Sequence, residues 1–291
     1  MLPWYFFSFI AALFSAGAAL LEKKILFKEK ALSFTTLLAI FNLLFALPFF
    51  FFSDITALTL SGFIALLIKS ILGGFAFLCV MHAIKRLEIS TALPLLILTP
   101  GLVAIFAYLT LGESLSNYEI LGLILMTAGT YVLGLRKNQK IFDPFKILIK
   151  NKGTIYILLA LFLFTITSIL DKALLKNFKV SVNALMGYQH LFLAIFFIVI
   201  LIFSKERLEI KETLKRSKYP ILILAAITII YRYFHILAIK ESSVALALSI
   251  KRISVFFAVL VGGTLFKEKK LIRKIIATVL MVIGALIIIN F

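Results

Sequence analysis

The sequence predicts an all-α membrane protein with ten transmembrane helices, arranged as two inverted five-helix repeats. The chain has 291 residues, is 63% hydrophobic and contains 30 Phe. This composition leaves too little polar surface for a soluble domain of this length. Apolar runs of about 18 residues or more recur along the chain, as bilayer-spanning helices require. The second half of the sequence also resembles the first.

Ten apolar segments are expected to cross the membrane as helices, because barrel strands would be short and alternating and other backbone would leave hydrogen bonds unmade. The first, 4–21, follows no basic region and contains no small-residue cleavage site, so it is expected to be a retained helix and not a signal peptide. The others are expected at 31–53, 60–84, 90–112, 118–135, 154–175, 181–204, 219–239, 243–266 and 271–291.

Basic residues alternate strongly between successive connections. Of the 31 Lys and Arg, 23 lie at the connections after the odd-numbered segments and only four at the connections after the even-numbered segments. The positive-inside rule then puts the odd connections in the cytoplasm and both termini outside. The net charge of +18 is therefore interpreted as a topology signal and a contact with anionic lipid headgroups, and no nucleic-acid partner is expected. The expected location is a prokaryotic inner (plasma) membrane.

The repeat is visible without gaps at a shift of 155, which lays residues 83–134 on 238–289. Glu113 then aligns with Glu268, and Gly129 with Gly284. Near the start of each half, Glu22-Lys23 aligns with Asp171-Lys172 at a shift of 149. Five helices per repeat invert the second copy, as in alternating-access transporters. The expected organisation is a first repeat at 1–135, a basic cytoplasmic linker at 136–153 and a second repeat at 154–291.

Two features outside the charged positions also predict structure. The charged segment 205–218 is expected to form a short interfacial helix or a solvated loop. Small residues seven apart, Gly122/Gly129 and Ala277/Gly284, form stripes on the segments 118–135 and 271–291. Packing within the bundle is the favoured interpretation of these stripes, and a homodimer through the same two segments is the alternative.

The acidic end of the fourth helix in each half carries a family resemblance. These ends read Ala-Tyr-Leu-Thr-Leu-Gly-Glu at 107–113 and Gly-Gly-Thr-Leu-Phe-Lys-Glu at 262–268, and each precedes a helix with a central Gly. With the two five-helix halves, they resemble the EamA-type branch of the drug/metabolite transporter superfamily. Pro100 fits the pattern of the fourth helix, whereas Val255 departs from it in the second half. The resemblance implies a transporter and leaves the substrate open.

A narrower similarity lies in the ninth segment, which reads Ser-Ile-Lys-Arg-Ile at 249–253. Plastid sugar-phosphate translocators of the same superfamily carry a Lys-Arg pair in their ninth helix that binds the substrate phosphate. Of their motif, this pair alone matches here. The resemblance therefore suggests an anion-binding role for Lys251 and Arg252.

Four cations fall inside the apolar segments, at Lys69, Arg232, Lys251 and Arg252. Helix rise places them at one level, roughly 10–14 Å from the side with few basic residues. A charge at such depth faces a cavity or a partner. All 13 Asp and Glu are expected at helix ends or in loops, so no buried carboxylate partner is expected and the missing partner is interpreted as an anionic ligand.

Polar residues at a similar level complete the predicted substrate site: Asn42, Tyr188, Gln189, His190, Tyr231 and Tyr233. Each has a structural alternative, such as a snorkelling lysine or a hydrogen-bonded core histidine. Lys251 and Arg252 point about 100° apart on a helix, so one of them is open to pairing with helix-end carbonyls. Glu113 and Glu268 are expected to end helices and brace the repeats, and Asp171 to pair with Lys172 or a nearby basic helix end.

The leading functional hypothesis is a secondary carrier of a small phosphorylated or carboxylated metabolite. An empty cationic cluster would resist desolvation, which favours exchange over uniport, and His190 is the expected mid-depth candidate for a coupling proton. An exporter of amino acids or apolar drugs, with structurally locked cations, is the main alternative, and an anion channel is a weaker one. Neither an enzyme nor a cofactor or metal site is expected, because metal-ligand spacing and a phosphate-binding Gly-Lys-Ser/Thr loop are missing from the sequence.

Overall fold

The computed structural model describes residues 2–53, 58–86, 98–134, 152–254, 257 and 271–290. Within these residues the chain forms ten α-helices and one short 3-10 helix, and no strand. The α-helices are α1 (Trp4–Leu26), α2 (Ala31–Phe51), α3 (Leu60–Arg86), α5 (Thr99–Leu111), α6 (Asn117–Gly134), α8 (Lys152–Lys176), α9 (Val182–Ile202), α10 (Ile210–Glu241), α11 (Val244–Lys251) and α13 (Leu271–Asn290).

Each predicted segment overlaps one of these helices, and six of the described spans are long and apolar enough to cross a membrane. The boundaries differ where charged residues continue a helix past its apolar run. Helix α1 extends to Leu26, five residues beyond the predicted end, and α10 begins at Ile210 instead of 219. The predicted linker 136–153 lies almost wholly outside the described residues, as do 90–97 and most of 252–266.

The charged segment after α9 is helical and not a loop, and its position at a membrane interface stays a prediction. It forms the 3-10 helix η1 (Lys205–Glu209) and the first turns of α10. Glu206 Oε2 accepts hydrogen bonds from the backbone N–H groups of Leu32 (3.2 Å) and Ser33 (3.3 Å), which start α2. A carboxylate at a helix N-terminus satisfies free donors and favours the helix dipole. Lys30 donates to Glu209, and this hydrogen bond raises the pKa of the lysine.

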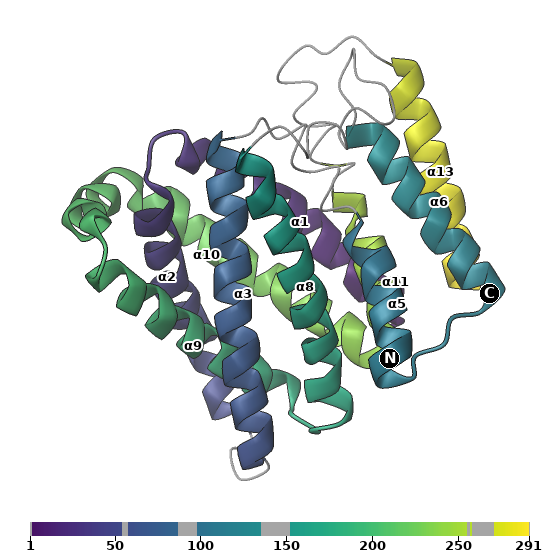
Figure 1. The fold of residues 1–291 in the computed structure, drawn as a ribbon, viewed down its shortest axis with the longest axis horizontal. Coiled ribbons are helices and arrows are strands. Elements are labelled where there is room, and N and C mark those ends of the chain that lie inside the picture. Colours follow the sequence, from purple (N-terminus) through teal and green to yellow (C-terminus); the bar gives the residue numbers. More distant parts are fainter. Residues whose placement is uncertain are drawn as a thin grey trace.

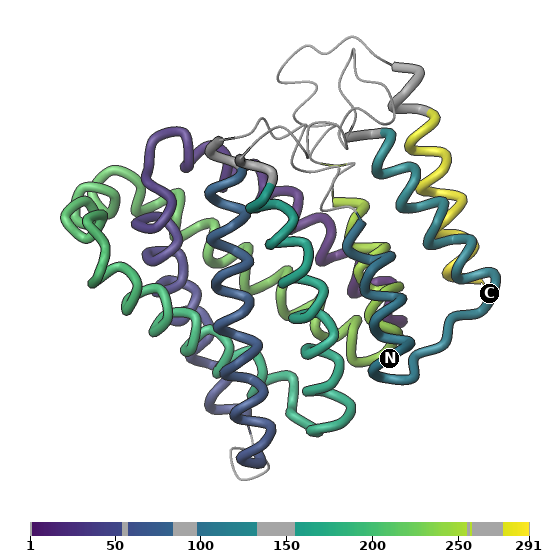
Figure 2. Tube along the Cα trace, in the orientation of Figure 1, coloured from purple at the N-terminus to yellow at the C-terminus, as the bar shows by residue number. Residues whose placement is uncertain are grey.

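The helices pair in a bundle in which neighbours in space are far apart in sequence. Helix α1 packs on α10, α3 on α8, and α2 on α9. Figure 1 shows α3 and α8 running next to each other across the bundle, and the tube in Figure 2 follows α1 and α10 along each other. One apolar core, with Phe34, Ile157 and Leu224, lies among α1, α2, α3, α8 and α10. A second, with Leu185 and Ile236, lies among α2, α3, α5, α8, α9, α10 and α11.

Helices α6 and α13 pack on each other at one edge of the bundle (Figure 1). Their small residues face each other. A Cβ on Gly122 would lie 2.7 Å from the Gly284 carbonyl oxygen, and a Cβ on Gly129 would lie 2.8 Å from that of Ala277. The stripes thus serve close packing within one chain, which is the favoured interpretation, whereas a homodimer through these two segments stays a prediction.

Replacement of Gly129 by Ala is expected to force α6 and α13 apart, because the new methyl group meets backbone atoms of α13 that cannot rotate away. Overpacking of this kind costs about 1–3 kcal/mol. Thermal unfolding of the purified protein in detergent measures the effect. Gly17→Ala in α1 is the matched control, because a Cβ there meets nothing within 4 Å and Ala favours a helix. Equal melting of the two variants would contradict the close-packing account.

Candidate functional site

A cavity of about 330 Å³ lies inside the bundle, lined from α1, α2, α3, α5, α8, α9, α10 and α11. This volume is in the range of small-molecule sites. Its walls combine apolar residues with charged and polar ones, and eight of the ten predicted site residues line it: Asn42, Lys69, Gln189, His190, Tyr231, Arg232, Lys251 and Arg252. The sequence placed these residues at one depth, and the structure brings them to one space.

A carboxylate that the sequence analysis assigned elsewhere lies at the centre of this site. Asp171 of α8 is buried, with Oδ1 2.7 Å from Lys69 Nζ and Oδ2 2.7 Å from Arg232 Nη2. Gln189 Oε1 accepts from both cations, at 3.0 Å from Arg232 Nη2. The expectation that the intramembrane cations lack a carboxylate partner is therefore wrong for Lys69 and Arg232. We call these four residues the Asp171 network.

Lys251 and Arg252 lie where α11 ends, and both line the cavity. They form no ion pair within the described part of the chain. The Lys251 ammonium lies 5.1 Å from the centre of the Tyr231 ring, within cation–π range. The Arg252 Nε is buried without a hydrogen-bond partner among the described residues. Both adjacent side chains line the cavity, although neighbouring residues of a regular helix point about 100° apart.

A second carboxylate of the cavity, Glu22 of α1, was missed by the sequence analysis. The predicted first segment ended at residue 21, so Glu22 was assigned to a helix end, whereas α1 continues to Leu26 and Glu22 lines the cavity. Its carboxylate interacts electrostatically with Lys251 but forms no ion pair or hydrogen bond within the described residues. The repeat alignment of Glu22 with Asp171 was the available signal.

Asn42 and His190 contribute hydrogen-bonding groups that no described protein atom uses. Asn42 Oδ1 and both His190 ring nitrogens are buried without partners among the described residues. Helices α2 and α9 run antiparallel, since Thr36 Oγ1 donates to the Phe197 carbonyl (3.4 Å) and Asn183 Nδ2 to that of Phe52 (2.9 Å). This register puts Asn42 level with His190. Unused polar atoms in a cavity are suited to a bound polar molecule or water.

The two remaining predicted residues, Tyr188 and Tyr233, lie outside the cavity lining. Tyr188 packs edge-on against Phe50 (5.2 Å between ring centres) and Phe63 (5.9 Å), and Tyr233 stacks on Phe49 (5.4 Å). Both belong to the apolar core around α9 and α10. Sequence depth alone could not separate them from Tyr231, because the face of each helix that points to the cavity is set by packing.

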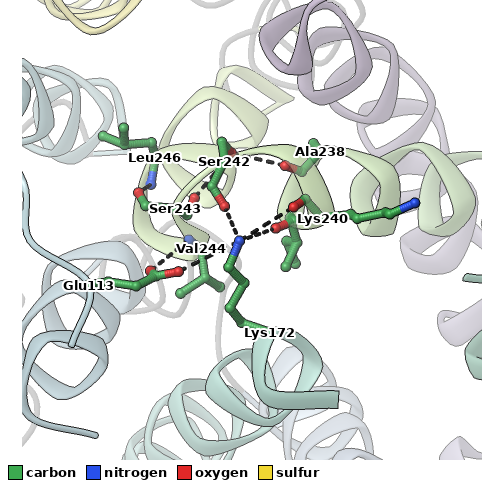
Figure 3. Close-up of polar contacts among 9 residues, drawn as sticks. Glu113, Lys172, Ala238, Lys240, Ser242, Ser243, Val244 and Leu246 are labelled. Carbon is green, nitrogen blue, oxygen red and sulfur yellow. Dashed lines mark hydrogen bonds and ion pairs between the residues drawn. The ribbon is translucent and has the colours of Figure 1, made fainter. Parts of the chain in front are cut away.

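A polar cluster at the α10–α11 connection explains where the neighbouring Lys172 goes (Figure 3). Lys172 Nζ donates to the carbonyls of Ile239 (2.8 Å) and Ser242 (2.7 Å) at the end of α10 and lies 3.7 Å from Glu113 Oε1. Glu113 Oε2 accepts from the Val244 N–H at the start of α11 (3.1 Å). The cation thus meets a helix C-terminus and the anion an N-terminus, as the helix dipoles favour.

This cluster gives Glu113 the bracing role expected of it, since it links the end of α5 to α8 and α11. Glu268, its counterpart in the repeat alignment, lies outside the described residues. Asp171 was expected to pair with Lys172 or a nearby helix end, and this was wrong. Adjacent residues on a helix point about 100° apart, so Asp171 faces the cavity while Lys172 faces the α10–α11 connection.

A bundle of long apolar helices around a charged internal cavity defines a polytopic helical membrane protein of the transporter class. The EamA-like transporter family matches residues 2–135 and 151–290, in two halves, and the chain belongs to this family. It is thus an integral membrane protein from a family of small-molecule transporters.

Comparison with solved structures supports the fold alone. A structure described as "Crystal structure of protein" superposes with a TM-score of 0.72 over 98% of this chain and 95% of its own, at 16% identity. Twenty-nine chains of known structure match in all. No curated protein matches the chain.

Asp171→Asn is expected to be the most damaging single change in the Asp171 network, because it leaves two buried cations without a countercharge. Loss of one partner from a buried ion pair costs about 3–5 kcal/mol. Lys69→Met is the comparison, because it leaves Asp171 and Arg232 paired one to one. Thermal unfolding in detergent should show Asp171→Asn melting well below Lys69→Met. The reverse order would mean that Asp171 does not hold the cations in place.

Proposed function

We propose that the chain is a secondary carrier that moves small organic anions, such as phosphorylated or carboxylated metabolites, by alternating access. The observation that carries this proposal is the charge balance of the cavity. Four cations line it against two carboxylates, Asp171 and Glu22. A cationic excess buried among apolar helices is costly unless a mobile anion offsets it.

The Asp171 network and the Lys251–Arg252 pair have different parts in this proposal. Asp171 already neutralises much of the charge on Lys69 and Arg232, so the anion is assigned to Lys251 and Arg252. The guanidinium offers a planar fork of donors to a carboxylate or phosphate, and the ammonium adds a compact charge. The unused Arg252 Nε supports this assignment.

The uncharged part of the substrate is assigned to Asn42 and His190. Their free polar atoms suit hydroxyl groups, which donate to Asn42 Oδ1 and exchange hydrogen bonds with the imidazole. Gln189 contributes less, because Lys69 and Arg232 already occupy its carbonyl oxygen. The favoured substrate is therefore an anion with a hydroxylated body.

The inverted repeat belongs to the same proposal, with a first repeat at 1–135, a linker at 136–153 and a second repeat at 154–291. In the repeat, α1 corresponds to α8 and α3 corresponds to α10. Exchange of the two halves therefore turns the α1–α10 pair into the α8–α3 pair, and the helices of both pairs pack on each other. The same exchange leaves the α2–α9 and α6–α13 pairs unchanged, because α2 corresponds to α9 and α6 to α13, and the helices of these pairs also pack on each other. This exchange symmetry of the packing supports ten spans in two opposed copies.

The proposed setting is a prokaryotic inner membrane, with both termini outside and the basic connections toward cytoplasmic anionic lipids. The Lys and Arg bias of the sequence supports this orientation. In this orientation the α10–α11 connection, with Glu113 and Lys172, lies on the outer side.

The second candidate function is an exporter of amino acids or apolar drugs whose cations are locked structurally. The pairing of Lys69 and Arg232 with Asp171 favours it, because two of the four cations already have a partner. It leaves Lys251 and Arg252 unexplained. The two functions therefore differ in what the Lys251–Arg252 pair binds.

Small anions are expected to stabilise the purified protein. Glycerol 3-phosphate, malate and inorganic phosphate at saturating concentration should raise the melting temperature by about 2 °C or more. Arg252→Gln should abolish the shift, because it removes the fork of donors. Arg207→Gln is the control, since Arg207 is exposed and outside the cavity. An unchanged melting-temperature shift in Arg252→Gln would show that the anion does not bind at the Lys251–Arg252 pair.

Competition separates the two candidate functions. In proteoliposomes, uptake of labelled glycerol 3-phosphate should fall when unlabelled malate or phosphate is added, and should be unaffected by a neutral amphiphile of similar size, because the cationic pair selects charge. Propyl phosphate, which lacks the hydroxyl groups, should compete less well than glycerol 3-phosphate. Inhibition by neutral amphiphiles without inhibition by anions would favour the drug exporter.

A further inference from the structure

Glu22 is a cavity carboxylate to which the anion-carrier proposal gives no task. It lies in the C-terminal part of α1, lines the cavity, and forms no hydrogen bond or ion pair within the described residues. It interacts electrostatically with Lys251, but the two form no ion pair within the described residues. A carboxylate in an apolar bundle without a close partner is costly when ionised, so a specific use of this residue is expected.

The repeat shows that Glu22 differs from its counterpart in surroundings, not in position. The 149-residue shift lays Glu22 on Asp171, and the 155-residue shift of the following helices lays Lys69 on Leu224 and Phe77 on Arg232. Asp171 therefore has Lys69 and Arg232 as close partners, whereas the equivalent positions around Glu22 hold Leu224 and Phe77. One carboxylate is fixed by two cations, and the other is left free to gain or lose a proton.

The charges that face Glu22 come from the elements packed against α1, which are α10, α11 and, more weakly, α2 and α3. Helix α2 presents no titratable group to the cavity. The titratable groups of the other three that line it are Lys69, Tyr231, Arg232, His235, Lys251 and Arg252. Lys69 and Arg232 are already paired with Asp171, and Lys251 is the cation that interacts electrostatically with Glu22. An anion bound to Lys251 and Arg252 would compete with the ionised Glu22 carboxylate for the same positive charge.

We propose that Glu22 binds the proton that accompanies each anion, so that the carrier is an anion–proton symporter. This inference depends on the proposed anion-carrier function. An anion at Lys251 and Arg252 disfavours the ionised Glu22 carboxylate, so the anion and the proton bind together more tightly than either binds alone. Coupling free energies are reciprocal. The loaded cavity therefore holds the anion and a neutral Glu22.

Glu22 also offsets positive charge in the cavity when the carrier is empty. After release of the anion, the proton leaves the Glu22 carboxyl for water, and the carboxylate left behind offsets part of the charge on Lys251 and Arg252. The expectation of strict exchange assumed a cavity without carboxylates. With an ionised Glu22, the empty cavity is closer to neutral and can return through the apolar bundle without a second anion.

The experiment uses the full chain in liposomes that contain the pH dye pyranine, with glycerol 3-phosphate added outside at equal pH. Wild type should acidify the lumen as it takes up the anion, and uptake should rise about fivefold or more when the outside is made more acidic. Glu22→Gln mimics the protonated carboxyl, so it should exchange external for internal glycerol 3-phosphate at every pH but lose acidification and acid-driven accumulation. Glu241→Gln, at the exposed end of α10, is the matched control and should behave as wild type.

Each other outcome counts against a specific statement. No binding, exchange or uptake of anions by wild type would overturn the anion-carrier function, and symport with it. Exchange by wild type without proton movement would overturn symport alone. Acidification that persists in Glu22→Gln would overturn the role of Glu22, and would be expected if the phosphate ester carried the proton itself. Acidification that is lost in His190→Gln but kept in Glu22→Gln would overturn it as well.

Discussion

The Asp171 network sets the geometry of the cavity. Lys69 on α3 and Arg232 on α10 are each 2.7 Å from the carboxylate of Asp171 on α8. Charges in a bilayer interior persist only when paired or hydrated, so this carboxylate holds three helices at a defined spacing. It also removes two of the four cations from competition for a ligand. The positive charge left over lies at the end of α11, which is where the proposed function puts substrate recognition.

A second constraint comes from the break between α10 and α11. A helix end leaves carbonyl and N–H groups without partners in the helix itself. Lys172 donates to carbonyl groups at the end of α10, and Glu113 accepts from an N–H group at the start of α11 (Figure 3). Both side chains are thereby committed to the backbone. The cluster also fixes the start of α11, and with it the position of Lys251 and Arg252 one helix length further on.

Much of the fold could be predicted from the sequence because hydrophobic length and loop charge depend on local composition. The depth of Lys69, Arg232, Lys251 and Arg252 followed from helix rise in the same way. What failed depended on helix boundaries and faces. The first helix was predicted to end five residues too early, so Glu22 was not recognised as a cavity residue. Asp171 and Lys172 are adjacent in sequence, which suggested a local ion pair that helical geometry does not allow. The aromatic packing of Tyr188 and Tyr233 depends on tertiary contacts that a single sequence does not contain.

In the proposed function, the positions where the two halves differ matter most. Internal symmetry supplies two similar frameworks, each with an acidic residue near the end of its first helix. Among the described residues, only the acid of the second copy has cations at ion-pair distance, Lys69 from the first copy and Arg232 from the second. In the proposed mechanism Asp171 is therefore structural and Glu22 is available to bind a proton. Lys251 and Arg252 belong to the second half and line the same cavity as Glu22, which belongs to the first half. An anion bound between them would touch both halves, and a ligand that contacts both halves can bias how they rock against each other.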